Sequence, residues 1–366
     1  MPPSPPVLAA VERRRALYAA ELSLGTDRFT GPRRDDCPWC GSSRLRTRLR
    51  GPDLLQRKPG TFVLDQCRDC EHAFQNPPLT AEGLAFHHGD IHDGHLEDFA
   101  ERLLAAGSGR RRHRHAARAI LALEPEPESW LDVGTGRAHF PRTARELFPY
   151  TAFDAVGTTG RVEEARRAGW IDEAHRGQLT TPGVLARLRS RYDVVSMFHH
   201  LEHTPDPRAE LHAALAALRP GGHLLVEMAD PRSHFAVLLG KWWLPQGQPR
   251  HLHLMPPANL RAELEARGCT VLRTDRRAPH IPHDLSAALA LALSHAFPAP
   301  DAPWRTTPPS ALRQTLRAAL LGATSPLVDV AALLDHTLAP LLRRTRFSNT
   351  YRLIARKERP DGPADD

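Results

Sequence analysis

The stretch W-L-D-V-G-T-G-R-A-H-F, residues 130–140, places two glycines between a short apolar run and a helical pattern. A strand, a glycine turn and a helix in this order present free backbone amides to a ligand, because glycine has no side chain to keep the ligand away. Gly134 and Gly136 have the spacing for this role, and Asp132 can bind a ligand ammonium group or organise the loop. A dinucleotide fold would require a third glycine where His139 stands, which disfavours NAD.

The sequence around this loop alternates short apolar runs with helical patterns. The runs lie at 129–134, 150–157, 192–198, 222–229 and 269–274, and the helices between them include 141–148, 207–218 and 257–267. Such alternation predicts parallel strands joined by crossover helices, and therefore a doubly wound α/β sheet. Residues 283–345 then form apolar helical patterns before one more strand-like run at 349–357, which indicates a helical insertion ahead of the last strand.

The composition is that of a globular chain. Of 366 residues, 41% are hydrophobic and 25% charged, which excludes a disordered chain, a collagen and a disulfide miniprotein. We find no run near the roughly 18 apolar residues of a membrane span, and no secretory signal at the start. We therefore expect a cytoplasmic protein without a transmembrane segment, and its five cysteines suit a reducing compartment.

The formal charge of +7 permits an anionic partner but does not identify one. The densest basic cluster, residues 110–118, lies in a helical pattern and lacks the aromatic or glycine residues that accompany base stacking. We interpret this cluster as a solvated helix face, so the sequence does not favour a nucleic-acid partner.

Four of the cysteines form two close pairs. Cys37 and Cys40 bracket CPWC, Cys67 and Cys70 bracket CRDC, and 26 residues separate the pairs. Two such turns can surround one Zn²⁺ with four thiolates, and a closed set of four is typical of a structural site. A redox pair is the alternative, but a redox motif opens a helix after a strand, whereas these lie in glycine-broken sequence.

Asp154 lies 22 residues beyond Asp132, at the end of the second apolar run. An acidic residue at that point can bind both hydroxyls of a ribose. A plain surface aspartate near a strand end is the alternative interpretation, and the glycine loop upstream favours the ligand.

Together these motifs resemble class I S-adenosylmethionine-dependent methyltransferases, of the broad group that carries an N-terminal zinc-ribbon-like CxxC module. The matching stretches are DVGTGRA (132–138), Asp154, YDVVSMFHHLEHTPDP (192–207), LRPGGHLLVEM (218–228) and HLHLMPPANLRAELEARG (251–268). The resemblance implies that the first loop surrounds the methionine part of the cofactor, Asp154 the ribose, and Gln178 the adenine. Gln178 stands where the family commonly has an aspartate. The cofactor contacts implied are Asp132, Gly134, Thr135, Gly136, Asp154, Gln178 and Phe198.

The stretch F-H-H-L-E-H-T-P-D-P, residues 198–207, ends the next predicted parallel strand, where open α/β sheets bind ligands. His199 and His203 are the candidate catalytic bases, because imidazole can take a proton near neutral pH. The stretch also resembles quinone-biosynthesis O-methyltransferases, which implies a weak cation site at His199, Glu202 and His203. Bracing of the loop is an equal alternative for His203.

A second aromatic and histidine-rich stretch runs from residue 241 to 257. Its Trp242, Trp243, His251 and His253 can line an acceptor pocket, or the tryptophans can pack against the helical insertion. The sequence does not separate these two interpretations.

The resemblance divides the chain into segments: a helical lead-in at 1–30, a zinc-ribbon-like module at 31–80, a helical connector at 81–124, a Rossmann-like methyltransferase domain at 125–277, a helical insertion or lid at 278–346, the last strand at 347–358 and a disordered tail at 359–366.

We expect methyl transfer from S-adenosylmethionine to a small-molecule acceptor, by O- or N-methylation in secondary or specialised metabolism, with a structural Zn²⁺. A zinc-ribbon nucleic-acid-binding protein on an inactive methyltransferase scaffold is one alternative. A peripheral membrane enzyme is another, because helices 285–297 and 327–342 are apolar, although we expect these helices to roof the active site.

Overall fold

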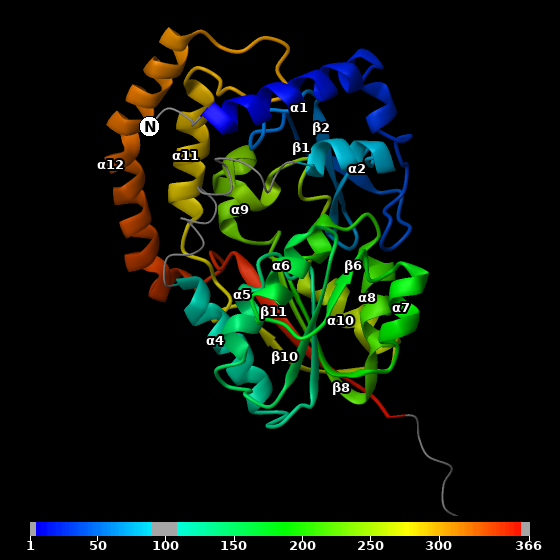
Figure 1. Ribbon diagram of the computed structural model, residues 1–366. Coiled ribbons are helices and arrows are strands. Elements are labelled where there is room, and N and C mark those ends of the chain that lie inside the picture. The colour runs from blue at the N-terminus through cyan, green and yellow to red at the C-terminus, as the bar shows by residue number, and fades with distance from the viewer. Residues whose placement is uncertain (1–4, 90–107, 360–366) are drawn as a thin grey trace, which may run out of the picture.

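The larger sheet has seven strands in the order β10-β11-β8-β7-β4-β5-β6. The computed structural model describes residues 5–89 and 108–359 (Figure 1). The strands are β4 (Ser129–Val133), β5 (Ala152–Gly157), β6 (Ala174–Arg176), β7 (Tyr192–Phe198), β8 (Leu218–Ala229), β10 (Cys269–Asp275) and β11 (Thr350–Lys357). Strands β4 to β8 run parallel to one another, and β11 is antiparallel to both of its neighbours, β8 and β10. The predicted doubly wound, mostly parallel sheet is confirmed, and the sequence analysis missed only the short β6.

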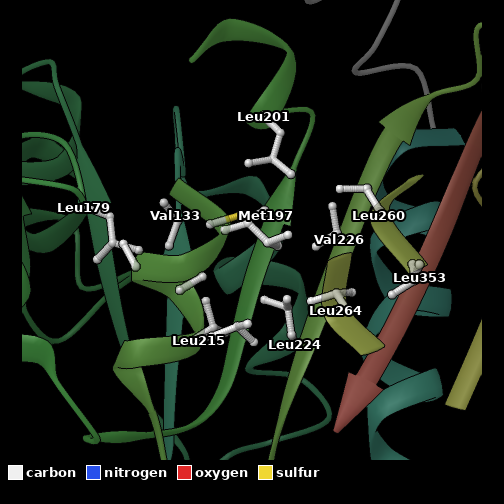
Figure 2. Packing of buried hydrophobic residues seen from close by; sticks show 14 of the residues in the cluster. Val133, Leu179, Met197, Leu201, Leu215, Leu224, Val226, Leu260, Leu264 and Leu353 are labelled. Carbon is white, nitrogen blue, oxygen red and sulfur yellow. The ribbon is translucent and has the colours of Figure 1, made fainter. Parts of the chain in front are cut away.

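Helices cover both faces of this sheet because successive strand residues point to opposite sides. One face carries α4 (Ser108–Leu121) and α5 (His139–Ala144), whose Ile120 and Phe140 pack with Trp130 of β4. The other face carries α7 (Pro182–Leu188), α8 (Pro207–Ala217) and α10 (Pro257–Ala266). Figure 2 shows Val133, Met197 and Val226 of adjacent strands in this second core. Helix α6 (Arg161–Arg167) packs beside β5 and β6.

The cysteine module is built around a second, four-stranded antiparallel sheet. Its order is β1 (Leu45–Gly51), β2 (Phe62–Cys67), β3 (Ala73–Gln75) and β9 (His253–Leu254). The last of these strands comes from the segment after β8, so the module does not end at residue 80 as its predicted boundaries imply. The pairing of β3 with β9 therefore joins the module to the larger unit through backbone hydrogen bonds.

Besides the helical insertion, three further helices and four 3₁₀ turns complete the described residues. They are α1 (Pro5–Ser23), α2 (Ala81–His88), α9 (His234–Leu238) and the 3₁₀ turns η1 (Asp27–Phe29), η2 (Leu201–His203), η3 (Gly240–Trp242) and η4 (Leu244–Gln246). Tyr18 of α1 lies edge-on to Phe86 of α2, with ring centroids 5.4 Å apart. Part of the predicted connector, 90–107, and nearly all of the predicted tail, 360–366, lie outside the described residues.

The helical insertion consists of α11 (Asp284–Ala296) and α12 (Ala311–Leu342), which lie side by side at one edge of the molecule (Figure 1). Helix α12 begins 16 residues before the predicted start at 327. By length and composition it is apolar enough to cross a membrane, and only 6% of its most apolar window is buried. Length and composition alone do not make α12 a transmembrane helix, so the expectation that the chain has no transmembrane segment stays a prediction. The search for an unbroken apolar run missed this helix because single polar residues interrupt its sequence.

Candidate active site

The glycine loop follows β4 at the carboxyl end of the parallel strands. Gly134 and Gly136 adopt φ values of +73° and +54°, and both are exposed. A Cβ atom at Gly134 would lie 2.3 Å from Nδ1 of His200, whereas one at Gly136 would meet no atom within 4 Å. Gly134 is thus required for space as well as for backbone conformation, and Gly136 leaves open room over the loop.

Asp132 lies beneath this loop and is buried. Its Oδ1 accepts a hydrogen bond of 2.6 Å from Ser196, whose Oγ in turn accepts one of 2.9 Å from Trp130 Nε1. Burial raises the pKa of Asp132 to about 6, although the Ser196 hydrogen bond opposes this shift. The buried hydroxyl of Thr135 lies close enough to Asp132 to lower the pKa of that carboxyl, although it makes no well-aligned hydrogen bond within the described part of the chain.

His200 was missed by the sequence analysis. Its Nε2 lies 2.9 Å from the carboxylate of Glu210, a buried residue of α8. Because the carboxylate can only accept, Nε2 carries the hydrogen. This bond holds the imidazole against Gly134, and the motif F-H-H-L-E-H gave no signal to separate it from its neighbours.

Asp154 does not lie with the glycine loop. It is the third residue of β5, opposite Leu131, and two residues short of the level of Val133 at the end of β4. Its carboxylate accepts hydrogen bonds from the Tyr192 hydroxyl at 2.8 Å and the Glu173 amide at 3.0 Å. These partners lie at the amino ends of β7 and β6, so the structure does not bring Asp154 together with the glycine loop, and its ribose contact stays a prediction.

Gln178 and Phe198 occupy the carboxyl edge of the sheet. Gln178 is exposed two residues after β6, and Phe198 is the last residue of β7. The Phe198 ring packs on Phe140 of α5, with centroids 4.4 Å apart. Both residues therefore lie at the sheet edge that carries the loop, which leaves their predicted cofactor contacts open to test.

His199 has both ring nitrogens engaged. Arg112 Nη1 lies 2.9 Å from Nε2, and Glu202 Oε1 lies 3.1 Å from Nδ1. Arginine can only donate, so Nε2 accepts and Nδ1 donates to Glu202, which defines a neutral imidazole with its hydrogen on Nδ1. The backbone of His199 has a φ of +50°, and its amide bonds the Glu227 carbonyl at 2.9 Å.

Arg112 corrects the interpretation of the basic cluster. Its side chain points inward, is 13% exposed, and donates to Glu227 Oε2 at 3.1 Å as well as to His199. Glu227 is fully buried and also accepts a 2.6 Å hydrogen bond from Arg352 of β11. Helix α4 thus directs the guanidinium of Arg112 toward His199, the candidate base. Other arginines of the cluster lie at the surface, where they contact Glu146.

Glu202 supports His199 from a buried position. Its Oε1 also accepts the Ala229 amide at 2.9 Å, while its Oε2 is buried without a hydrogen bond to any residue described by the structure. Burial is the largest single influence and raises the pKa of Glu202, but the hydrogen bond and charge of His199, the charge of His251 and the Ala229 amide together lower it more. Glu202 is therefore a carboxylate at neutral pH.

His203 is oriented away from this pair. Its Nδ1 donates to the Arg250 carbonyl at 3.0 Å, and its ring lies 4.7 Å from that of His251. Burial, reinforced by the charges of His251 and Arg250, lowers the pKa of His203 well below its ordinary value. This arrangement matches the bracing alternative. His199, Glu202 and His203 are also not among the sets of three or more ligand atoms that converge within the described chain.

The stretch after β8 is packed rather than open. Trp243 is fully buried, and its Nε1 donates to Asp284 at the start of α11 at 2.7 Å. Trp242 lies edge-on to His295 of α11, with centroids 6.0 Å apart. His253 Nδ1 lies 3.1 Å from Nε2 of His72, and His251 donates to the Pro245 carbonyl at 2.9 Å. The tryptophans therefore pack against the helical insertion, as the second interpretation requires.

The four cysteines converge. The Sγ atoms of Cys37 and Cys70 are 3.6 Å apart, as are those of Cys40 and Cys67, and all four lie within 4.8 Å of one another. Sulfurs bonded tetrahedrally to one zinc at about 2.3 Å would be about 3.8 Å apart, so the donor set fits Zn²⁺. Gly41 and Glu71, which follow the two pairs, both adopt left-handed φ values that turn the chain after each second cysteine.

Residues 108–274 match the protein family described as a methyltransferase domain. A ubiquinone biosynthesis O-methyltransferase of Alkalilimnicola ehrlichii is 32% identical over 126 residues, which cover 34% of this chain and 51% of that protein. The protein of the same name from Methylobacterium nodulans is 29% identical over 157 residues, covering 41% and 62%. The chain spans about half the length of such relatives.

Among solved structures, a SAM dependent methyltransferase from Archaeoglobus fulgidus is 16% identical with a TM-score of 0.43, and the match covers 72% of this chain and all of that one. The assignment depends on the family match and on the strand order, in which antiparallel β11 lies between β8 and β10. Residues 108–274 thus match a methyltransferase domain and, with β11, form a sheet with the class I strand order, preceded by a module in which four cysteines converge.

Proposed function

We propose that the chain is an S-adenosylmethionine-dependent methyltransferase that methylates a hydroxyl group of a small molecule. The observation that carries this proposal is the Glu202–His199–Arg112 array at the carboxyl end of β7, one residue from the His200 ring that contacts the glycine loop. The relatives named as O-methyltransferases support an oxygen nucleophile.

The glycine loop suits the cofactor. Gly136 is exposed, with open space where a Cβ would be. Asp132 would organise the loop from below through its bond to Ser196. When bound, S-adenosylmethionine supplies an electrophilic methyl group on its sulfonium, and the protein's task is to align an acceptor with it.

His199 would act as the general base through Nε2. Its Nδ1 hydrogen bond to the buried Glu202 fixes the tautomer and would stabilise the imidazolium that forms when Nε2 takes a proton. Arg112 now donates to Nε2, so an acceptor hydroxyl must replace that contact.

Arg112 would then stabilise the acceptor oxygen. Glu227, held by Arg352 on its other side, keeps the Arg112 guanidinium beside His199 when the Nε2 contact is given up. A cation at that position favours the negative charge that develops on an oxygen as it loses its proton. Arg112 and His199 thus have complementary roles in activating a hydroxyl group.

We also propose a structural Zn²⁺ at Cys37, Cys40, Cys67 and Cys70. Four thiolates complete a tetrahedral shell and leave no open position for substrate, so the metal would stabilise the module rather than take part in the chemistry. The nucleic-acid-binding alternative has no support in the comparisons, and Arg112, part of its basic cluster, is buried beside Glu227.

The test measures transfer of a labelled methyl group from S-adenosylmethionine to a panel of small phenols and quinols, together with calorimetry of cofactor binding. We expect His199→Ala to lower the single-turnover rate by about 10²–10⁴-fold, with cofactor affinity changed less than about twofold. His203→Ala is the matched control, and we expect it to lower the unfolding midpoint without changing the pH profile of the rate. Near-parental rates for His199→Ala with an unchanged pH profile would exclude the base assignment, and no cofactor binding would contradict the proposed activity.

A further inference from the structure

Helix α12 carries an apolar stripe that no other described part of the protein covers. Six of its side chains recur at spacings of three, four or eleven residues and are 40–64% exposed: Leu316, Leu327, Val330, Leu334, Leu338 and Leu341. Exposed Ala319 and Ala323 continue the line across the longest gap. These spacings place the residues on one face of a helix.

A second face of α12 packs on the protein. Ala331 and Asp335 are buried there, and the Asp335 carboxylate accepts hydrogen bonds from the backbone amides of Leu285 and Ser286 at 3.0 and 2.9 Å. The helix is thereby held lengthwise along α11 (Figure 1). A third face is polar, with Ser325, Asp329 and His336 exposed. A helix anchored on one side and polar on another lies along a surface rather than crossing a bilayer.

Both ends of the stripe are basic. Arg313 is exposed in the first turn, and Arg343, Arg344 and Arg346 are exposed directly after Leu341. If two copies of the protein paired through this stripe, basic ends of the two helices would meet whether the helices ran parallel or antiparallel. Repulsion between these like charges disfavours such a dimer. Anionic lipid headgroups complement both ends, and the chain as a whole carries a formal charge of +7.

We propose that α12 docks the protein on an anionic lipid bilayer, with the apolar stripe in the interface and the arginines on the headgroups. This role differs from the roof over the active site expected from the sequence, since the side chains of the stripe are exposed. It is independent of the methyl-transfer proposal, because no residue of the stripe belongs to the candidate active site.

Flotation of the full chain with vesicles tests the proposal. We expect binding at least about tenfold tighter to vesicles of phosphatidylcholine with phosphatidylglycerol than to phosphatidylcholine alone. The triple variant Leu327→Ser, Leu334→Ser, Leu341→Ser should bind at least about tenfold more weakly. The matched control Leu17→Ser, Leu24→Ser, Leu123→Ser changes exposed leucines elsewhere and should bind like the parent.

Replacement of Arg343, Arg344 and Arg346 by Gln should remove the preference for phosphatidylglycerol while retaining the weaker binding to phosphatidylcholine. Equal unfolding midpoints will show that the variants are folded. No flotation of the parent with either vesicle would overturn the proposal. A dimer in light scattering that the Leu327, Leu334 and Leu341 substitutions dissociate would also overturn it, because the stripe would then bind a second copy.

Discussion

Two constraints act on Gly134, one from its own backbone conformation and one from the side chain of His200. Its φ of +73° is accessible to glycine at little cost, and the imidazole of His200 fills the space where any Cβ would stand. His200 is in turn held by Glu210 of α8. The loop is therefore shaped by its own backbone and by a side chain 66 positions later in the sequence.

We predict that Gly134→Ala weakens S-adenosylmethionine binding by at least about tenfold, because the left-handed conformation costs about 1–2 kcal/mol and the new methyl group collides with His200. Gly136→Ala carries the conformational cost alone and should weaken binding less. Calorimetry on both variants measures the difference. Equal losses would show that the His200 contact does not shape the cofactor loop.

Asp284 is a residue whose charge opposes folding. It is buried at the start of α11, where it accepts hydrogen bonds from Trp243 and from Asn349 of the turn before β11. Burial raises its pKa from 3.8 to about 7, although the Trp243 and Asn349 hydrogen bonds oppose the shift. The folded chain thus holds this proton more tightly than the unfolded chain does.

A raised carboxyl pKa has a defined effect on stability. Between pH 4 and 7 the folded state binds more protons at Asp284, so this group lowers the free energy of unfolding as pH rises, and its full penalty is present above pH 7. We predict that Asp284→Asn gains stability relative to the parent across this range, by an amount on the order of 1–4 kcal/mol. Urea unfolding at several pH values tests this, and a difference independent of pH would show that the carboxyl group does not titrate there.

Among the elements, α11 and α12 depend on each other through Asp335. The amides of the first turn of a helix lack partners within it, and Asp335 of α12 supplies an acceptor for two of these amides in α11 as well as for the Ser286 hydroxyl at 2.7 Å. One side chain therefore caps α11 and anchors α12, whose other large side chains are mostly exposed.

We predict that Asp335→Ala lowers the free energy of unfolding by about 1–3 kcal/mol, because buried amides lose their acceptor. Asp329→Ala removes an exposed carboxylate from the same helix and should change it by less than about 0.5 kcal/mol. Chemical denaturation of both variants gives the comparison. Similar small effects would mean that α12 is held by its apolar contacts with α11 alone.

At the scale of the whole molecule, the cysteine module and the methyltransferase domain share one sheet. Residues 253–254 form its fourth strand, and the Gln75 amide bonds the Leu252 carbonyl at 2.8 Å. The Leu252 amide bonds the Glu202 carbonyl at 2.7 Å, so this connection reaches the residue that supports His199. Backbone hydrogen bonds thus join the cysteine module to the candidate active site.

We predict that the parent binds about one zinc ion per chain and that Cys37→Ser loses it. In that variant, hydrogen exchange should become faster at residues 251–256 as well as within the module, because β3 no longer holds β9. Cys269→Ser, in β10 away from the cluster, should retain the zinc. Zinc loss without faster exchange at 251–256 would show that the shared sheet does not depend on the metal.

Local sequence patterns were sufficient to predict most strands of the larger sheet and the convergence of the four cysteines. The apolar runs predicted six of the seven strands of the larger sheet, and the close cysteine pairs predicted a set of four converging sulfurs that the structure contains. The match of residues 108–274 to a methyltransferase domain agrees with the resemblance stated from the glycine loop and the strand-end motifs. These features depend on residues within a few positions of one another, so periodicity and spacing reveal them.

Tertiary contacts decided the rest, because they join residues far apart in the chain. Arg112 is one of several arginines in its helix, and only the packing of α4 on the sheet places it 2.9 Å from His199. Asp154 had the right residue type, but the register of β5 directs its carboxylate to Tyr192. The sequence by itself indicated the domain type and the four cysteines that converge. Strand register and helix packing decided which titratable groups contact one another and which face of α12 stays exposed.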